Sequence, residues 1–430
     1  MEKKLFARYP LGNPRRIWRQ ENYVLAIATP GPTGLDKGNA RHLEQARRAV
    51  ETSVDAGFNQ LELLWASPAV GMEIVKTAER LGTNVIFQDL RRFGGMGFAK
   101  EKLNENNDLM GSMRDTACWK SIVGYYVFDE PINDEQRKIT REMIDIVERE
   151  RPGMLACTVC TAGTKNINKL ADDVDPAQLC FDTYPFGNTK AVMKAEDQLD
   201  CSRMWYSMEI AYRAAKRIGA PFWFYYQGHE LFYHPRFDRY TFAASRMMAN
   251  AAILYGAKGI SSYVEMNGVL DSETGGHGYH FEEQKELNQK TAKLGNTLMA
   301  LECLRVIHDD TLAPDREEWP EVRHTMEDSE LLTGTLAPRF SVSEHADNYG
   351  HRYLMVLNRD YRLENHYCLT LKQASRVYRV SAETGCEQLA FENDDKILGH
   401  LEPGGLVLYR IQAMEEEPYT LEYYLEKRPQ

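Results

Sequence analysis

The chain has 430 residues, of which 43% are hydrophobic and 10% aromatic, and it carries a formal net charge of −11. This length and composition predict a soluble folded protein with room for a barrel of about 250 residues and one smaller domain. The negative charge argues against nucleic acid and anionic membranes as partners, because both attract basic surfaces.

The chain as given has no run of about 18 apolar residues and no signal-peptide core near Met1, so we expect a cytoplasmic protein. Its cysteines include one CxxC pair, Cys157 and Cys160. These lie in a strand-like run where residues three apart point to opposite faces, and no second pair completes a zinc site. We therefore expect reduced core thiols, no metal site and no cofactor.

From Asn22 onward, short apolar segments alternate with amphipathic ones, which is typical of βα units. Helices are predicted at 39–56, 200–218 and 239–255, among others. The predicted strands are 23–29, 60–66, 85–90, 124–130, 155–160, 178–185, 221–227 and 259–265. Eight such units predict an α/β fold with a closed (β/α)8 TIM barrel. The alternative, an open doubly wound sheet, calls for a glycine-rich first turn that residues 29–34 do not provide convincingly.

After a closing helix at 281–303, the pattern changes to short runs separated by turn residues. The runs at 352–358, 366–371, 376–381 and 406–411 predict a small all-β sandwich domain. The predicted organisation is a barrel over 1–320, a β-sandwich over 325–415 and an acidic tail over 416–430.

The most informative stretch is Gly124–Pro131, an uncharged run of β-forming residues that ends in Asp129 and Glu130. Proline cannot continue a strand ladder, so Pro131 should place both carboxyl groups at the C-terminal end of the strand. TIM barrels carry their chemistry at that end.

Other polar and aromatic side chains are expected at the same end of the barrel. Carboxyl, amide and aromatic groups together suit a polyhydroxylated ligand, because rings stack on sugar faces while the polar groups bind hydroxyls. The candidate substrate-binding residues are Trp65, Asp89, Asp129, Asp182, Tyr184, Gln227, His229 and Tyr263. We therefore expect a carbohydrate substrate.

Several motifs resemble those of clan-A barrel glycoside hydrolases, particularly the β-galactosidase-like branch with a trailing β-sandwich. They are Gly124–Pro131, Phe181–Pro185, Pro221–Gln227, Tyr255–Ile260 and Tyr353–Arg359. The resemblance implies that Glu130 is the general acid/base, with Asp129 in the place of the usual asparagine. It also implies a glutamate nucleophile at the end of strand seven, where this chain has Gln227.

The second catalytic carboxyl group is therefore expected from Glu230 or Glu265. Glycoside hydrolysis needs two carboxyl groups, about 5 Å apart for retention and about 6.5–9.5 Å apart for inversion. Glu130 would protonate the leaving oxygen with a pKa raised by burial, while Glu265 acts as base or nucleophile. Asp182 and Tyr184 would orient the acids or the sugar.

Two other kinds of function stay open. A catalytically inactive carbohydrate-binding barrel would account for Gln227. A metal-dependent barrel enzyme acting on a sugar-like substrate could use Glu62, Asp89, Asp182 and His229 as ligands. The barrel fold itself does not separate these alternatives, because it hosts many chemistries.

Overall fold

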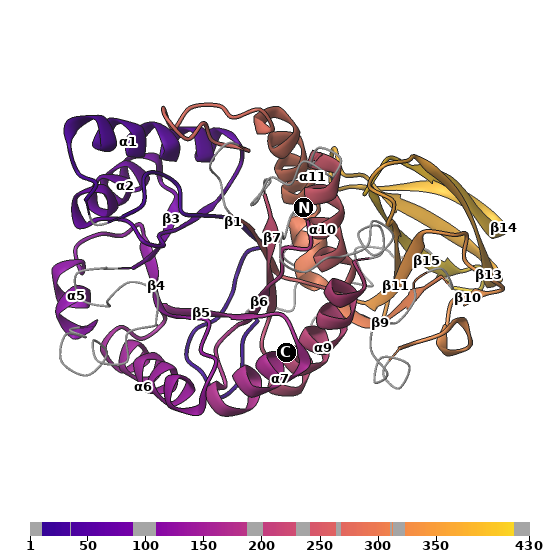
Figure 1. Ribbon diagram of the computed structural model, residues 1–430. Helices are drawn as coiled ribbons and strands as arrows, with labels where there is room; N and C mark the ends of the chain where they lie inside the picture. The colour runs from indigo at the N-terminus through magenta and orange to yellow at the C-terminus, as the bar shows by residue number, and fades with distance from the viewer. Residues whose placement is uncertain are drawn as a thin grey trace.

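A computed structural model describes residues 11–34, 36–88, 109–186, 201–228, 241–263, 268–309, 312 and 323–416. Eight parallel strands form a closed barrel in sequence order, and β1 closes it by pairing with both β2 and β8 (Figure 1). The strands are β1 (Val24–Ala28), β2 (Gln60–Glu62), β3 (Asn84–Phe87), β4 (Ile122–Asp129), β5 (Leu155–Thr161), β6 (Leu179–Asp182), β7 (Phe222–Gln227) and β8 (Gly259–Tyr263).

Helices surround this barrel, and their ends follow from local sequence. Ser67 caps the second helix and Gly82 ends it in a left-handed conformation, while Asn133 and Gln136 form a capping box at the start of α6. The helices are α1 (Ala40–Asp55), α2 (Pro68–Leu81), α5 (Leu109–Asp115), α6 (Asp134–Glu150), α7 (Thr164–Lys169), the π-helical turn η2 (Leu170–Val174), α9 (Ser202–Ile218), α10 (Phe242–Leu254) and α11 (Phe281–Ala300).

The barrel has two apolar layers. An inner cluster, which includes Tyr126, Cys157 and Tyr225, fills the space enclosed by the strands. An outer cluster, which includes Tyr125 and Cys160, lies between the strands and the helices. Cys157 and Cys160 therefore lie on opposite faces of β5, as the sequence predicted, and the cysteines are free thiols.

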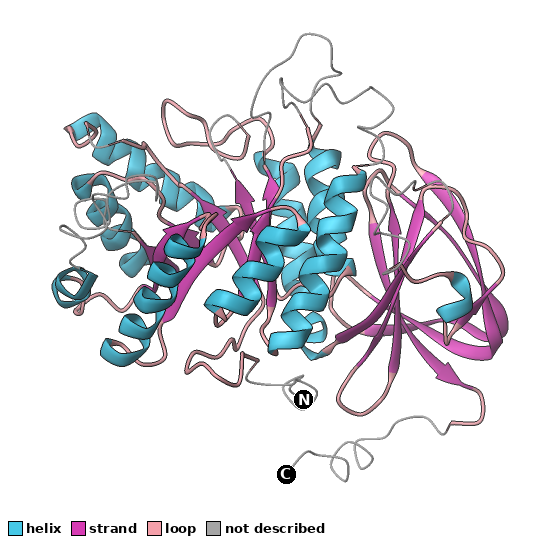
Figure 2. Cartoon of the chain, turned by 60° about the horizontal axis from the view of Figure 1, so that its bottom comes forward, coloured by secondary structure: helices cyan, strands magenta, loops and turns pink. Residues whose placement is uncertain are grey.

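A curled antiparallel sheet of seven strands follows the barrel (Figures 1 and 2). It encloses its own apolar core. Its strands are β9 (Glu302–His308), β10 (Leu332–Thr333), β11 (Phe340–Ala346), β12 (Arg352–Asn358), β13 (Asn365–Val380), β14 (Glu387–Leu401) and β15 (Leu406–Ala413), with a 3-10 turn η3 at Met326–Asp328. The predicted TIM barrel followed by a small all-β domain is confirmed.

The sheet begins before the predicted boundary at 325, because β9 already pairs with β11.

The sheet is held to the barrel by polar contacts as well as by packing. Asn250 of α10 donates to the Gly404 carbonyl at 2.8 Å, and Arg246 forms an ion pair with Glu402 at 2.6 Å. The hydroxyl of Tyr255, which follows α10, lies 2.9 Å from Nε2 of His308 on β9.

Among the described residues, no helix is long and apolar enough to cross a bilayer.

Candidate active site

Five of the eight barrel strands end in a carboxyl, amide or tyrosine side chain. Glu62, Asp129, Asp182, Gln227 and Tyr263 are the last residues of β2, β4, β6, β7 and β8. Because the strands are parallel, these ends meet at one end of the barrel, where TIM barrels bind their substrates. We call this end the barrel mouth.

A β-bulge in β4 sets the direction of Asp129. Tyr126 pairs with Cys157 and Phe128 pairs with Thr158, so one residue of β4 has no counterpart on β5. An extra residue of this kind bends a strand and redirects the side chains after it. Here it brings the Tyr126 hydroxyl within 2.9 Å of Asp129 Oδ1. Tyr126 therefore holds Asp129 in place.

Glu130 follows β4 with a positive φ of 51°, which is unusual for a residue other than glycine. Its amide donates to the Val159 carbonyl of β5 at 3.1 Å, which fixes this conformation. Residues held in such sparsely populated conformations cluster at functional sites. The helix α6 that follows is capped by Asn133 rather than by Asp129, so neither carboxyl group is used as a helix cap.

Glu130 and Asp182 lie close enough for each to affect the ionisation of the other. Burial raises the pKa of Glu130, and the charge of Asp129 raises it further. Burial, followed by the charges of Glu130 and Asp129, raises the pKa of Asp182 well above its ordinary value. Burial also raises the pKa of Asp129. The raised pKa that the sequence suggested for Glu130 thus agrees in direction.

Three aromatic side chains adjoin these carboxyl groups. The Tyr184 ring stacks on that of Tyr263 at 5.0 Å and 22°, and Trp65 meets Tyr263 edge-on at 6.1 Å. Burial and the charge of Asp182 raise the pKa of Tyr184, and burial and the charges of Asp129, Asp182 and Glu130 raise the pKa of Tyr263. The site therefore combines acids with a wall of aromatic rings.

Gln227 has a different setting from that of the acids. It is fully buried, and both ends of its side-chain amide are hydrogen-bonded to the backbone of Phe186. Its predicted contact with substrate stays a prediction.

Glu62 is also fully buried. It accepts hydrogen bonds from Ser261 at 2.7 Å and from Gln60 at 3.1 Å. Burial raises its pKa above the ordinary value. Glu62 thus belongs to the barrel interior rather than to an open surface.

Four predicted site residues, Glu230, Glu265, His229 and Asp89, lie outside the described residues. Within the described ranges, no group of three or more His, Cys, Asp and Glu side chains is arranged to hold a metal ion. Asp89 and His229, two of the four ligands of the metal-dependent alternative, lie outside those ranges, so this alternative stays a prediction.

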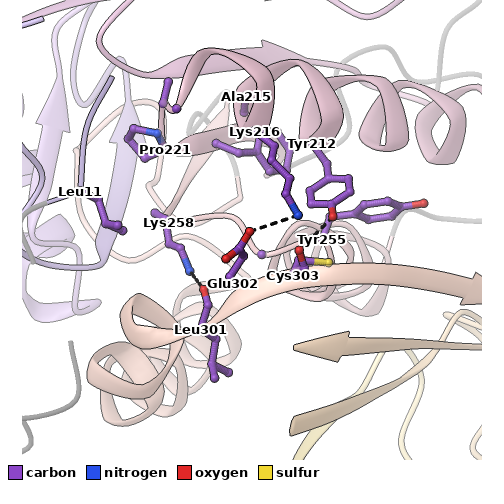
Figure 3. A pocket seen from close by; sticks show the side chains of 14 residues that line it. Leu11, Tyr212, Ala215, Lys216, Pro221, Tyr255, Lys258, Leu301, Glu302 and Cys303 are labelled. Atoms are coloured by element: carbon purple, nitrogen blue, oxygen red, sulfur yellow. Dashed lines mark hydrogen bonds and ion pairs between the residues drawn. The ribbon is translucent and has the colours of Figure 1, made fainter. Parts of the chain in front are cut away.

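A separate pocket of about 210 Å³ lies at the other end of the barrel, next to Pro221 and Lys258, which precede β7 and β8 (Figure 3). Lys216 forms an ion pair with Glu302 across it at 3.1 Å, and Lys258 donates to the Leu298 and Leu301 carbonyls at 2.5 Å each. These contacts join the barrel to β9, which indicates a structural role for this pocket.

Sequence reasoning missed two supporting side chains. Tyr126 was predicted only as part of a buried strand, and Gln88, whose Oε1 accepts the Trp65 amide at 3.0 Å, was not singled out. Periodicity predicts that such residues are buried, but their partners depend on the register between strands. A tyrosine on the inner face of a strand that ends in a carboxylate was the available signal.

The comparisons with known proteins found similarity in structure only. No family model matches the sequence, and no characterised protein matches it at the level of sequence. An α-amylase from Anoxybacillus has a TM-score of 0.50 and 11% identity, with 92% of this chain and 99% of that one covered. A Bacteroides fragilis protein assigned as an α-galactosidase or melibiase has a TM-score of 0.50 and 11% identity over 91% and 79% of the two chains.

A β-galactosidase from the psychrophilic Marinomonas ef1 aligns over 65% of this chain and 62% of its own, with a TM-score of 0.49 and 11% identity. The α-amylase and the Bacteroides fragilis protein carry the names of glycoside hydrolases. At such identities the likeness shows a shared fold, a parallel barrel with a β-rich domain, and leaves the chemistry to the residues of the site.

Proposed function

We propose that this protein is a glycoside hydrolase in which Glu130 is the general acid/base. One observation carries the proposal: the mouth of the barrel gathers the carboxyl groups of Glu130, Asp129 and Asp182 beside the rings of Tyr184 and Tyr263. An acid with a raised pKa next to an aromatic wall is the arrangement that protonation of a glycosidic oxygen requires.

The pKa of Glu130 suits the role of an acid. Burial and the charge of Asp129 favour its protonated form, so part of the Glu130 population keeps its proton at a pH where an exposed glutamate has lost it. The same group, once ionised, activates water in the second half of a retaining reaction or completes an inverting one. Tyr126 keeps the neighbouring Asp129 in a fixed position.

The second catalytic carboxyl group is proposed to come from Glu265 or Glu230. In the sequence, Glu265 comes two residues after the end of β8 and Glu230 three residues after the end of β7.

The aromatic wall supports a sugar as the substrate. Tyr184, Tyr263 and Trp65 present rings that can pack against the apolar face of a pyranose, while Asp129 can bind its hydroxyls. A carbohydrate-binding barrel without catalysis is the second candidate, and the observation that favours it is that β7 ends in an amide, Gln227.

The test is the pair of variants Glu130→Gln and Glu142→Gln, assayed on a panel of natural oligosaccharides and aryl glycosides. Glu142 lies on the exposed outer helix α6 and serves as the control. We expect Glu130→Gln to lower kcat on unactivated glycosides by at least about 10²-fold, because a positioned acid contributes that much. Full activity of Glu130→Gln would refute the assignment. Sugar binding without turnover by the parent protein would favour the second candidate.

A further inference from the structure

Thr161, the last residue of β5, lies between two strands that end in acids. β5 pairs with β4 on one side and with β6 on the other. β4 ends in Asp129, β6 ends in Asp182, and Thr161 is the register partner of Asp182. Thr161 therefore belongs to the barrel mouth, next to Asp182.

The side chain of Thr161 points toward the inside of the barrel. Cys157 and Val159, four and two positions earlier, belong to the inner apolar cluster, and alternate residues of a strand share one face. Residues 155–160 are buried, whereas Thr161 is half-buried. On β5, Thr161 is therefore the inward-facing residue that a ligand in the barrel mouth can reach.

Asn166 fixes the hydroxyl of Thr161. Asn166 lies on α7, the helix that follows β5, and its Nδ2 donates to Thr161 Oγ1 at 2.7 Å. The hydroxyl oxygen is thus an acceptor in this contact, and a threonine hydroxyl can donate one hydrogen bond besides. Within the part of the chain that the structure describes, no group accepts the hydrogen of Thr161. It is therefore available to a ligand.

Asp182 complements this donor. Neighbouring strands lie about 4.8 Å apart, so the hydroxyl of Thr161 and the carboxyl group of Asp182 are side by side at the end of the barrel. A carboxyl group accepts hydrogen bonds whether or not it is ionised. Two hydroxyl groups on adjacent carbons of a sugar match this pair, because one can accept from Thr161 while the other donates to Asp182.

We propose that Thr161 is a substrate-binding residue, whose hydroxyl donates to one of two neighbouring sugar hydroxyls while Asp182 accepts from the other. Asn166 is a positioning residue, because it acts through Thr161. The inference rests on the proposed function and deepens it. The substrate is then a glycoside whose sugar unit carries an intact vicinal diol where it is bound next to Asp182.

The kinetic test compares the parent protein with Thr161→Val and Thr161→Ser. The substrates are nitrophenyl glycosides of glucose, galactose, mannose and xylose, followed by monodeoxy analogues of the sugar that is hydrolysed. We expect Thr161→Val to lower kcat/KM about fivefold to tenfold, as for the loss of one hydrogen bond between uncharged groups. Thr161→Ser keeps the hydroxyl and should stay close to the parent. On the analogue that lacks the contacted hydroxyl, Thr161→Val and the parent should be equal.

Thr158→Val is the matched control. Thr158 lies on the same strand, but it is buried and its hydroxyl donates to the Phe128 carbonyl at 2.8 Å. Thr158→Val should lower stability and leave unchanged the ratio of kcat/KM between the sugar and each deoxy analogue. If Thr161→Val costs nothing, or costs the same on every analogue, the inference is overturned. The proposed function would stand in that case, because a glycoside is still hydrolysed.

A second variant tests how Asn166 orients the Thr161 hydroxyl. Asn166→Asp replaces the amide donor by a carboxylate, which accepts the hydrogen of Thr161 and withdraws it from the sugar. We expect kcat/KM to fall as far as in Thr161→Val, and no further in the double variant, because both changes remove the same contact. Additive losses in the double variant would show that Asn166 does not act through Thr161.

Calorimetric titration with the same glycosides separates this inference from the proposed function. If the parent protein binds a glycoside without hydrolysing it, the proposed function fails, and weaker binding by Thr161→Val would still support the contact. Equal affinity of the parent and Thr161→Val would reject the contact. If the parent binds none of these glycosides, both the inference and the proposed function fail.

Discussion

Gln227 is hydrogen-bonded to both backbone groups of a single residue, Phe186. Its Oε1 accepts from the Phe186 amide at 3.1 Å and its Nε2 donates to the Phe186 carbonyl at 2.7 Å. A carboxylate can make only the first of these contacts, because it has no donor for a carbonyl oxygen. The residue at the end of β7 therefore ties the chain after β6 to the barrel, which a glutamate nucleophile at this position would not do.

Replacing Gln227 by glutamate is expected to lower the free energy of unfolding by about 1–3 kcal/mol near neutral pH, the cost of an unsatisfied buried polar group. Burial should raise the pKa of the new carboxyl group above its unfolded value, so the native state binds the extra proton and stability falls as pH rises. Urea denaturation at about pH 5 and about pH 8 measures this difference. A gain in glycosidase activity by Gln227→Glu would contradict the structural role.

Tyr126→Phe should weaken the site through Asp129. The hydroxyl of Tyr126 donates to Asp129 Oδ1 at 2.9 Å and favours the ionised form of Asp129. Its removal should raise the pKa of Asp129 further and cost about 1.5–3 kcal/mol where Asp129 is ionised, with a smaller cost once acid protonates Asp129. Chemical denaturation across that pH range is the measurement.

Tyr125→Phe is the matched control for this prediction. Tyr125 lies on the same strand but on its outer face, and its hydroxyl pairs with the neutral Thr116 at 2.8 Å. Its loss should cost about 0.5–1.5 kcal/mol at every pH, as for a bond between uncharged groups. Equal pH dependence in the two variants would count against a special link between Tyr126 and Asp129.

Most of the barrel could be predicted from the sequence because its strands are buried on both faces and stand out as continuous apolar runs. Two of the strands that periodicity missed, β9 and β14, depend on pairing with a neighbouring strand. β14 exposes most of its side chains, including Leu389 and Leu398, and gains its order from β13. β9 was predicted in part as the end of the closing helix, and it becomes a strand because β11 lies beside it. No local pattern contains that information.

The site was predictable to the level of strand ends and no further. The positions of Asp129 and Glu130 followed from Pro131, and those of Asp182 and Tyr263 followed from their own strands. The bulge in β4 and the positive φ of Glu130 depend on how β4 and β5 are aligned. A shift of one residue in that register would turn the side chains to the other face.

The difference in the free energy of unfolding between Glu62→Gln and the parent protein should shift in favour of the variant as pH rises. Glu62 is fully buried and its pKa is raised by burial, so between its unfolded and folded pKa values the native state holds a proton that the unfolded chain has lost. The stability of the parent therefore falls as pH rises through that window. Glutamine keeps the shape, can accept from Gln60 and donate to Ser261, and does not ionise. Denaturation midpoints of both proteins at about pH 5 and about pH 8 should diverge. Parallel pH curves for the two proteins would show that Glu62 is not a protonated buried acid.

Asp309→Ala should separate the contribution of a buried ion pair at the domain junction from that of exposed pairs. Asp309, which follows β9, forms an ion pair with Arg359, whose guanidinium lies over the ring of Trp205 on α9 at 6.0 Å. Both charged side chains are almost fully buried. Removing the carboxylate takes the Asp309 counter-ion away from a buried guanidinium, so we expect a loss of about 3–5 kcal/mol in the free energy of unfolding.

The control is Glu286→Ala, which breaks the largely exposed pair with Lys290 on α11 and should cost less than about 1 kcal/mol. Calorimetry of both variants is decisive, because equal losses would mean that the Asp309–Arg359 pair does not stabilise the junction between the barrel and the sheet.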